Sequence, residues 1–297
     1  MRYAPQSAKS TQVTEWDDGR RRPILDELAV EEPLEICVNG RPASVTMRTP
    51  GDDFELAAGF LLTEGLVNHR SDIARVNYGT SADGQVTGNR VEVTLSREGE
   101  IDLSRLERNA TVTSSCGVCG RTSIDTVHAR GLARLGTGFT ISADQLTSLP
   151  AALGSAQRVF GRTGGLHAAA LFDRSGSMIA IFEDIGRHNA VDKAIGRALQ
   201  TDHLPLSDAI LVVSGRGGFE IVQKALVAGV PVVVASLWPV DSEATSDLMV
   251  AFHRFRKNGK STTQALQLAQ QEIMDKQNYR SPYYWAGFTA IGGYSEF

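Results

Sequence analysis

From residue 164 onward, short apolar runs alternate with helical segments, and this alternation restricts the possible folds more than any other feature of the chain. A helical segment that ends at Gly229 leads directly into another apolar run, and two strands joined in this way lie parallel with a right-handed crossover. The alternation therefore predicts a layered α/β domain with polar loops at its strand ends. The predicted strands cover residues 167–172, 178–183, 209–214 and 230–236, and the predicted helices cover residues 189–199 and 219–228.

The residues before this domain predict a smaller α+β unit. Apolar runs predict strands over 34–38 and 90–96. Asp52, with Glu55 three residues later, predicts a helix N-cap with a capping-box partner, and the helix is expected to stop near Gly65. Cys37 lies inside the first strand, where buried packing is the expected role of a cysteine, so it is given no catalytic role.

The fold class that follows is α/β, with a small α+β N-terminal domain, a three-layer α/β domain and an atypical C-terminal tail. The expected divisions are a flexible leader (1–30), the small α+β domain (31–108), a loop and connection that carry two cysteines (109–135), the α/β domain (136–236) and a C-terminal segment that completes or extends the sheet (237–297).

Composition narrows the possible partners. With 42% apolar residues the chain of 297 residues can bury a proper core, and its net charge of −4 gives no basic field for nucleic acid or for an anionic membrane. The first thirty residues hold no apolar export segment, and no apolar run approaches the roughly 20 residues of a membrane helix. We therefore expect a cytoplasmic protein that binds neither nucleic acid nor membrane.

Cys116 and Cys119 stand in the string SSCGVCG, on a segment rich in serine and glycine that predicts a loop. A structural zinc site would need about four ligands, and no second CxxC accompanies the pair. A thioredoxin-like dithiol would follow a strand at a helix N-terminus, and incidental surface thiols are disfavoured because they oxidise. An exposed, nucleophilic thiol that carries sulfur as a persulfide fits the segment best among these alternatives, and no metal is expected.

Three polar loops in the α/β domain carry candidate binding residues. Each contains glycines, and two of them lead into a helix whose first backbone amides favour anions. None is a Walker A or GxGxxG string, so tight-turn glycines remain the simpler explanation for any one loop. Together they favour a nucleotide-type ligand. The candidates are Gly164, Gly165, His167, Asp184, Gly186, Arg187, His188, Ser214, Gly215 and Arg216.

A zinc deaminase also combines a histidine motif with a cysteine pair. Here His167 is followed by Ala168 and Ala169, so the glutamate of the HxE motif is missing, and the cysteines precede the histidine. Deaminase activity is therefore not expected.

Five motifs, in this order, closely resemble the formate dehydrogenase accessory sulfurtransferase family (FdhD) over about residues 13–236. They are EEPLEICVNGRPASVTMRTPGDDFELAAGFLLTEGLV, SSCGVCG, TGGLHAAAL, EDIGRHNAVDKAIG and SGRGGFEIVQKALVAG. The resemblance implies that the α/β domain is cytidine-deaminase-like in fold, without deaminase chemistry, and that the protein forms a homodimer.

The same resemblance implies a sulfurtransferase. It implies that Cys116 accepts persulfide sulfur from a cysteine desulfurase, with Cys119 assisting, and that the sulfur passes to the molybdenum or tungsten bis-guanine-dinucleotide cofactor of formate dehydrogenase. The glycine-rich loops would then hold the nucleotide and diphosphate parts of that cofactor, and guanine nucleotide would be a surrogate ligand. The competing hypothesis is a non-catalytic nucleotide-binding or scaffolding protein.

After about residue 236 the sequence departs from that family and resembles the C-terminal part of a CHAT domain, a caspase-like protease module. The chain is therefore interpreted as a fusion, a chimera joined at the strand AGVPVVVAS. Protease activity is not expected, because the cysteine of such a site would fall near SGRGG, which has none. The tail predicts helices over 243–257 and from Ser261, then a strand over 287–293. Because the family's usual C-terminus contacts the cofactor, we expect impaired sulfur delivery.

Overall fold

The computed structural model describes residues 6–17, 20–80, 84–97, 135, 138–236 and 242–286. Its strands are β1 (Ala8–Asp17), β2 (Arg20–Ala29), β3 (Glu32–Val38), β4 (Arg41–Arg48), β5 (Ile73–Thr80), β6 (Val86–Leu95), β7 (His167–Asp173), β8 (Met178–Asp184), β9 (Ala209–Arg216) and β10 (Val232–Ser236). Its helices are α1 (Asp53–Thr63), η1 (Arg70–Asp72), α4 (Ala143–Ala156), α5 (Phe160–Thr163), α6 (Arg187–Gln200), α7 (Phe219–Val227), α8 (Ser242–Lys257), α9 (Thr262–Asp275), η2 (Gln277–Tyr279) and α10 (Pro282–Trp285).

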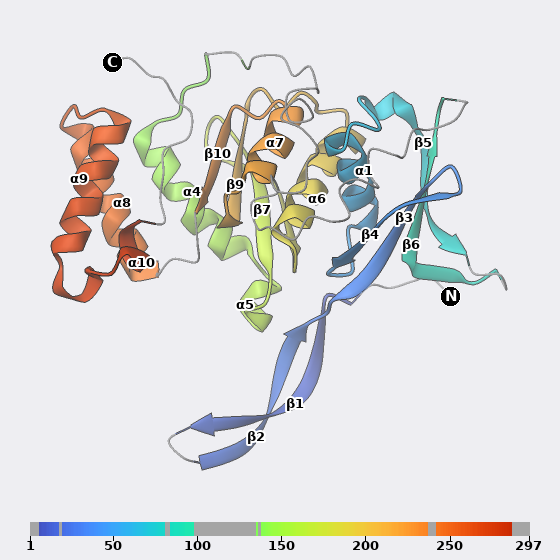
Figure 1. The fold of residues 1–297 in the computed structure, drawn as a ribbon, viewed down its shortest axis with the longest axis horizontal. Helices are drawn as coiled ribbons and strands as arrows, with labels where there is room; N and C mark the ends of the chain where they lie inside the picture. Colours follow the sequence, from blue (N-terminus) through green and yellow to red (C-terminus); the bar gives the residue numbers. More distant parts are fainter. Residues whose placement is uncertain are drawn as a thin grey trace.

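The central sheet has the strand order β10-β9-β7-β8. β9 and β10 run parallel, as the predicted strand-helix-strand unit requires, whereas β7 is antiparallel to both β8 and β9. α4 packs on one face of the sheet, and α6 and α7 cover the other (Figure 1). These three layers confirm the predicted α/β class.

A second sheet has the order β4-β3-β6-β5 and packs against α1. β3 pairs antiparallel with β4 and parallel with β6, so its alternate side chains Leu34, Ile36 and Val38 reach the same apolar core as Leu211 of the central sheet. α1 and α6 therefore lie between two sheets, and one core joins them (Figure 1).

The helices α1 and α6 meet at two glycines, Gly59 and Gly196. A Cβ atom on Gly59 would lie 1.9 Å from the carbonyl oxygen of Asp192, and one on Gly196 would lie 1.9 Å from the carbonyl oxygen of Glu55. Since these distances are far shorter than any contact between atoms that are not bonded, only glycine allows the two backbones to touch here. The pair sets the separation of the two helices.

Residues 8–17 and 20–29, expected as part of a flexible leader, instead form the antiparallel strands β1 and β2, which project from the body of the molecule (Figure 1). The strands of the hairpin carry many exposed side chains, some of them charged. Even the apolar side chains Trp16 (61% exposed) and Leu25 (76%) are exposed. Because neither face is buried, the residues do not show the alternation of apolar and polar side chains by which a strand is normally predicted.

The helix predicted after Asp52 forms as α1, but the predicted cap does not. Asp52 adopts a left-handed conformation with φ of 53°, and its side chain makes no capping hydrogen bond. The neighbouring carboxylate, Asp53, is instead buried against the guanidinium of Arg48, with Nε and Oδ1 2.8 Å apart. The expected capping box is therefore wrong, because a capping side chain normally needs an extended N-cap backbone, and that of Asp52 is left-handed.

The tail forms a helical hairpin, α8 and α9, with α10 against it, and it lies beside α4 (Figure 1). Its apolar cluster, which includes Leu248, Ala265 and Ile273, is separate from the other cores. Ser261 and Gln264 form the predicted capping box at the start of α9. The strand expected over 287–293 lies outside the described residues. Of the helices described, none combines the length and the apolar character needed to span a bilayer.

Candidate functional site

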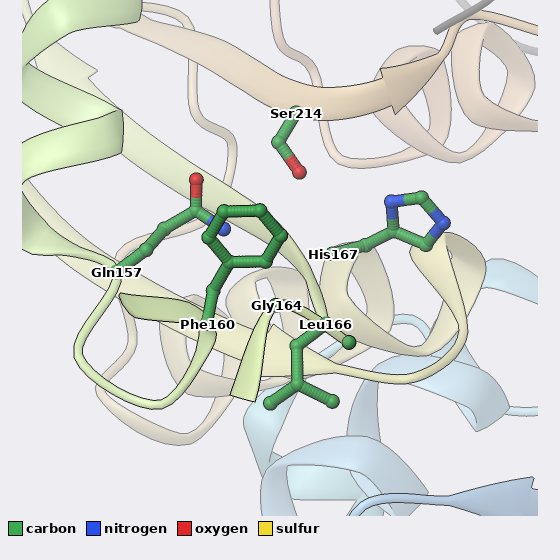
Figure 2. A pocket seen from close by; sticks show the side chains of 7 residues that line it. Gln157, Phe160, Gly164, Leu166, His167 and Ser214 are labelled. Carbon is green, nitrogen blue, oxygen red and sulfur yellow. The ribbon is translucent and has the colours of Figure 1, made fainter. Parts of the chain in front are cut away.

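A cavity of about 260 Å³ opens at the end of β7, beside the loop before it. Four of the ten candidate residues line it, namely Gly164, Gly165, His167 and Ser214, and Figure 2 shows their surroundings. Gln157, Phe160 and Leu166 complete the lining. The structure thus brings parts of two predicted loops together, because β7 and β9 are neighbours in the sheet.

The glycines before His167 shape the first wall. Gly164 ends α5 in a left-handed conformation, with φ of 64°, which favours glycine. A Cβ atom on Gly165 would approach the Cβ of Ala29 on β2 to 3.2 Å, so the base of the projecting hairpin touches the rim of the cavity. The loop therefore turns sharply and leaves its backbone beside the cavity.

The second wall comes from the end of β9. The Ser214 hydroxyl accepts a hydrogen bond from the backbone N–H of Ala168 at 2.8 Å, which ties β9 to β7 at the cavity. A Cβ atom on Gly215 would lie 3.1 Å from Nδ1 of His167 and 3.2 Å from the side chain of Arg187. Gly215 thus lets the His167 imidazole and the aliphatic part of the Arg187 side chain pack directly against the backbone.

Positive charge gathers beside this wall. Burial lowers the pKa of His167, and the charges of Arg187 and Arg216 lower it further, against an opposing effect of Asp184. Burial and the charge of Arg216 also lower the pKa of Arg187, whereas Glu220 acts in the opposite direction. His167 is therefore neutral near pH 7, and the two arginines repel one another. An anion bound between them would relieve this repulsion.

His188, the second residue of α6, has a different environment. Its Nε2 lies 3.6 Å from a carboxylate oxygen of Glu220 on α7. Burial nevertheless lowers its pKa to about 4, because it outweighs the attraction of Glu220 and is assisted by the charges of Arg187 and Lys224. His188 is neutral at physiological pH and links α6 to α7 rather than lining the cavity.

Asp184 and Gly186 serve the local fold. The carboxylate of Asp184 is fully buried and forms an ion pair with Lys193 at 2.8 Å. It also accepts hydrogen bonds from the backbone N–H groups of Thr49 (3.2 Å) and Gly186 (2.8 Å) and from the Asn189 amide (3.0 Å). Both residues were expected to contact a ligand, but the protein itself occupies these carboxylate oxygens and the Gly186 N–H.

A second buried ion pair lies deeper, between α6 and α7. The ammonium of Lys224 contacts both carboxylate oxygens of Asp192, at 2.9 and 2.8 Å, and the hydroxyl of Thr63 on α1 at 3.0 Å. Burial raises the pKa of Asp192 to about 6 even beside this cation. The cluster holds α1, α6 and α7 together behind the site.

Two lining residues, Gln157 and Phe160, were not found by the sequence reasoning. They lie at the end of α4 and the start of α5, outside any glycine-rich motif. The carboxylate of Glu183 accepts hydrogen bonds from the backbone N–H groups of Val159 (2.9 Å) and Phe160 (2.7 Å), which fixes this turn against β8. Only the fold reveals that this turn closes the cavity.

Cys116 and Cys119 lie outside the described residues. Cys37 is fully buried in β3, and burial raises the pKa of its thiol to about 11, so it is a poor nucleophile at neutral pH. Among the side chains that the structure describes, no group of three or more His, Cys, Asp or Glu residues could hold a metal ion.

The fold and the site define an α/β protein with a pocket at one end of its central strands, where the charges of Arg187 and Arg216 act on the pocket residue His167. Within that class the chain belongs to the FdhD/NarQ family, whose model matches residues 29–242.

Relatives from bacteria and an archaeon support this assignment. The chain is 49% identical over 243 residues to the sulfur carrier protein FdhD of Mycobacterium tuberculosis, a match that covers 77% of this chain and 87% of that protein. It is 50% identical over 248 residues to that of Streptomyces avermitilis (80% and 87% covered). It is 41% identical over 225 residues to that of Sulfolobus acidocaldarius (76% and 83% covered). The family resemblance expected from the motifs is thus confirmed.

Among solved structures, the fold is similar to that of a formate dehydrogenase accessory protein from Desulfotalea psychrophila. The TM-score is 0.57 at 21% identity, over 77% of this chain and 83% of that chain. At this identity the likeness supports the fold alone.

A second family model, the CHAT domain, matches residues 206–293. It overlaps the first match between residues 206 and 242, a region that contains β9, α7 and β10. The change of resemblance expected near residue 236 is confirmed. The overlap of the two matches is consistent with a fusion of two families at a strand that both contain.

Proposed function

We propose that this protein is a sulfur carrier that transfers persulfide sulfur to the molybdenum or tungsten bis-guanine-dinucleotide cofactor of formate dehydrogenase. The observation that carries the proposal is the near-50% identity to sulfur carrier proteins over 87% of their length. The pocket supports it, because the positive charges of Arg187 and Arg216 act on His167 in its lining and would suit the diphosphate of such a recipient.

The proposed transfer begins with the thiolate of Cys116, which attacks the outer sulfur of a persulfide on a cysteine desulfurase. The sulfur–sulfur bond of the donor breaks, the donor's cysteine leaves as a thiolate, and Cys116 holds the new persulfide. Cys119, three residues after Cys116, assists by shielding or resolving the persulfide. We propose that the protein works as a homodimer in the cytoplasm, and that it is no protease.

The recipient fits what the described residues offer. Gly215 lets its backbone lie directly against His167 and Arg187, and any side chain at this position would fill the space beside these two residues. These residues would hold phosphate groups, and the bound cofactor would supply the metal that finally receives the sulfur.

Cys116→Ala should abolish sulfur loading. Incubation with a cysteine desulfurase and cysteine, followed by intact-mass analysis, should show one added sulfur atom on the natural chain and none on the variant. Cys37→Ala is the matched control and should load like the natural chain, because Cys37 is buried and its thiol pKa is about 11. Sulfur that still loads onto Cys116→Ala, or a variant that still activates formate dehydrogenase, would contradict the proposal.

We also propose that the exchanged tail weakens delivery to the cofactor. A chain in which the family's usual ending replaces residues 237–297 should load sulfur equally but activate formate dehydrogenase several-fold better, because its C-terminus contacts the cofactor. Activation of the enzyme, measured at equal sulfur loading, tests this. Equal activation by the two chains would refute the effect of the tail.

A further inference from the structure

Thr49, in the connection between β4 and α1, bonds each of its three polar groups to the segment that carries Arg187. Its backbone N–H donates to Oδ2 of Asp184 at 3.2 Å, and its hydroxyl accepts the backbone N–H of Ile185 at 3.1 Å. Its carbonyl oxygen accepts from the ammonium of Lys193 at 3.1 Å. Thr49 is only 2% exposed. One buried residue of the small α+β unit therefore holds both α6 and the turn before it.

A buried ion pair keeps Thr49 itself in place. The preceding residue, Arg48, is fully buried, and its guanidinium pairs with the carboxylate of Asp53 at 2.8 Å. The same guanidinium donates to the carbonyl oxygen of Gly88 on β6 at 2.9 Å. Because a buried, hydrogen-bonded ion pair resists displacement, the hydroxyl of Thr49 is a fixed point to which the Ile185 N–H is tied.

The tie to Ile185 reaches Arg187 through a short stretch of backbone. Ile185 and Gly186 connect β8 to α6, and Arg187 is the first residue of that helix. The side chain of Arg187 lies against Gly215, where a Cβ atom would approach it to 3.2 Å. The imidazole of the pocket residue His167 lies against the same glycine, at 3.1 Å from that Cβ position. The place of Arg187 beside the pocket thus follows from where Ile185 is held.

The hydroxyl of Thr49 matters for Ile185 more than for the buried carboxylate of Asp184. That carboxylate keeps its ion pair with Lys193 at 2.8 Å and the backbone N–H of Thr49 whether or not the hydroxyl is present. The Ile185 N–H has the hydroxyl as its acceptor, and this hydrogen bond is only partly buried. Without the hydroxyl, we expect the N–H to turn towards water and the backbone up to Arg187 to move with it.

We propose that Thr49 is a positioning residue, which holds Arg187 beside His167 in the place where an anionic group is received. Arginine binds phosphate through N–H groups of fixed direction, so a displaced guanidinium loses part of these bonds. In this way the small α+β unit controls the charge at a site of the α/β domain. The inference rests on the proposed function only in taking a phosphate-bearing ligand.

NMR titration of His167 in the full chain reports the position of Arg187 without any ligand. Thr49→Val removes the hydroxyl and retains the backbone bonds, so His167 should titrate at a pH about 0.3 higher or more than in the natural chain. The reason is that the charge of Arg187, which lowers the pKa of His167, moves away. Arg216 also lowers this pKa and Asp184 raises it, and both stay in place. Thr49→Ser retains the hydroxyl and should titrate like the natural chain.

Thr63→Val is the matched control for a merely structural role. Thr63 is as buried as Thr49, with 1% against 2% exposed. Its hydroxyl bonds Asp192 at 2.9 Å and Lys224 at 3.0 Å, in the cluster behind the site. Thr63→Val should lower the stability to urea at least as much as Thr49→Val and leave the titration of His167 unchanged. An unchanged His167 in Thr49→Val, or an equal change in Thr63→Val, would show that the positioning role is wrong.

Calorimetric titration with inorganic pyrophosphate extends the test to a ligand. Thr49→Val should bind pyrophosphate about fivefold or more weakly than the natural chain, and Thr49→Ser should bind it within about twofold. Equal affinities of Thr49→Val and the natural chain would overturn the role in anion binding. If the natural chain binds no pyrophosphate, the anion site of the proposed function fails, whereas the titration of His167 still decides whether Thr49 holds Arg187.

Discussion

Gly196→Ala is expected to destabilise the protein by about 4 kcal/mol or more, enough to prevent folded protein from accumulating. The added methyl group would lie 1.9 Å from the carbonyl oxygen of Glu55 and 2.6 Å from the backbone nitrogen of Gly59. Both atoms belong to the backbone of α1, so no side-chain rotation can relieve the overlap and the helices must separate. That separation would open the core that both sheets share.

Urea denaturation, followed by circular dichroism, measures the effect of Gly196→Ala. Gly154→Ala is the matched control: it also lies in a helix, α4, but a Cβ atom there would meet nothing within 4 Å. Since alanine is the better helix former by about 1 kcal/mol, the control should be unchanged or slightly stabilised. Similar stabilities for the two variants would show that α1 and α6 are not in backbone contact.

Lys224→Met is expected to destabilise the protein by about 3–5 kcal/mol near neutral pH. The substitution leaves the Asp192 carboxylate buried, with the Thr63 hydroxyl as its remaining partner in the cluster. Lys276→Met is the matched control, because Lys276 pairs with Asp247 at 2.6 Å but is 42% exposed, and such surface pairs contribute about 0–1 kcal/mol. Equal losses in the two variants would contradict a buried role for Lys224.

The loss in Lys224→Met should also depend on pH. Burial already raises the pKa of Asp192 to about 6, and removal of the cation raises it further. A carboxyl group whose pKa is higher in the folded than in the unfolded protein binds its proton more tightly when folded. The stabilisation that comes from this tighter proton binding is complete below the ordinary pKa of 3.8. It is lost as the pH rises through the pKa of the folded protein. Urea denaturation at about pH 4.5 and about pH 7.5 should therefore show the larger deficit at the higher pH. A deficit independent of pH would refute this explanation.

The sequence predicts those elements whose own residues carry the signal. The strand predicted over 167–172 appears as β7 and the helix over 243–257 appears as α8, because each buries one apolar face or run. The hairpin of residues 8–29 gives no such signal, because its exposed side chains lie on both faces. Neither does the contact between Gly59 and Gly196, which depends on how two helices cross.

The candidate site was predicted in part for a similar reason. Glycine-rich loops at strand ends indicate a site, so Gly165, His167 and Ser214 could be named from their motifs. Gln157 and Phe160 are recognisable only once α4 and α5 are placed against β8. Conversely, Asp184 looks like a ligand contact in its loop, and only the structure shows that Lys193 and the Thr49 backbone occupy its oxygens.

The place of β10 in the central sheet explains how a chain can change family at this strand. In the described part of the chain β10 lies at the edge of the sheet, and β9 is its one neighbour. An edge strand has a single pairing to preserve, so a recombined gene can graft a foreign segment after it without altering the register of β9, β7 or β8. The helices α8 and α9 bring an apolar cluster of their own, so the tail does not depend on the other cores for its packing. The fused chain can therefore keep its fold even where the exchange of the tail affects function.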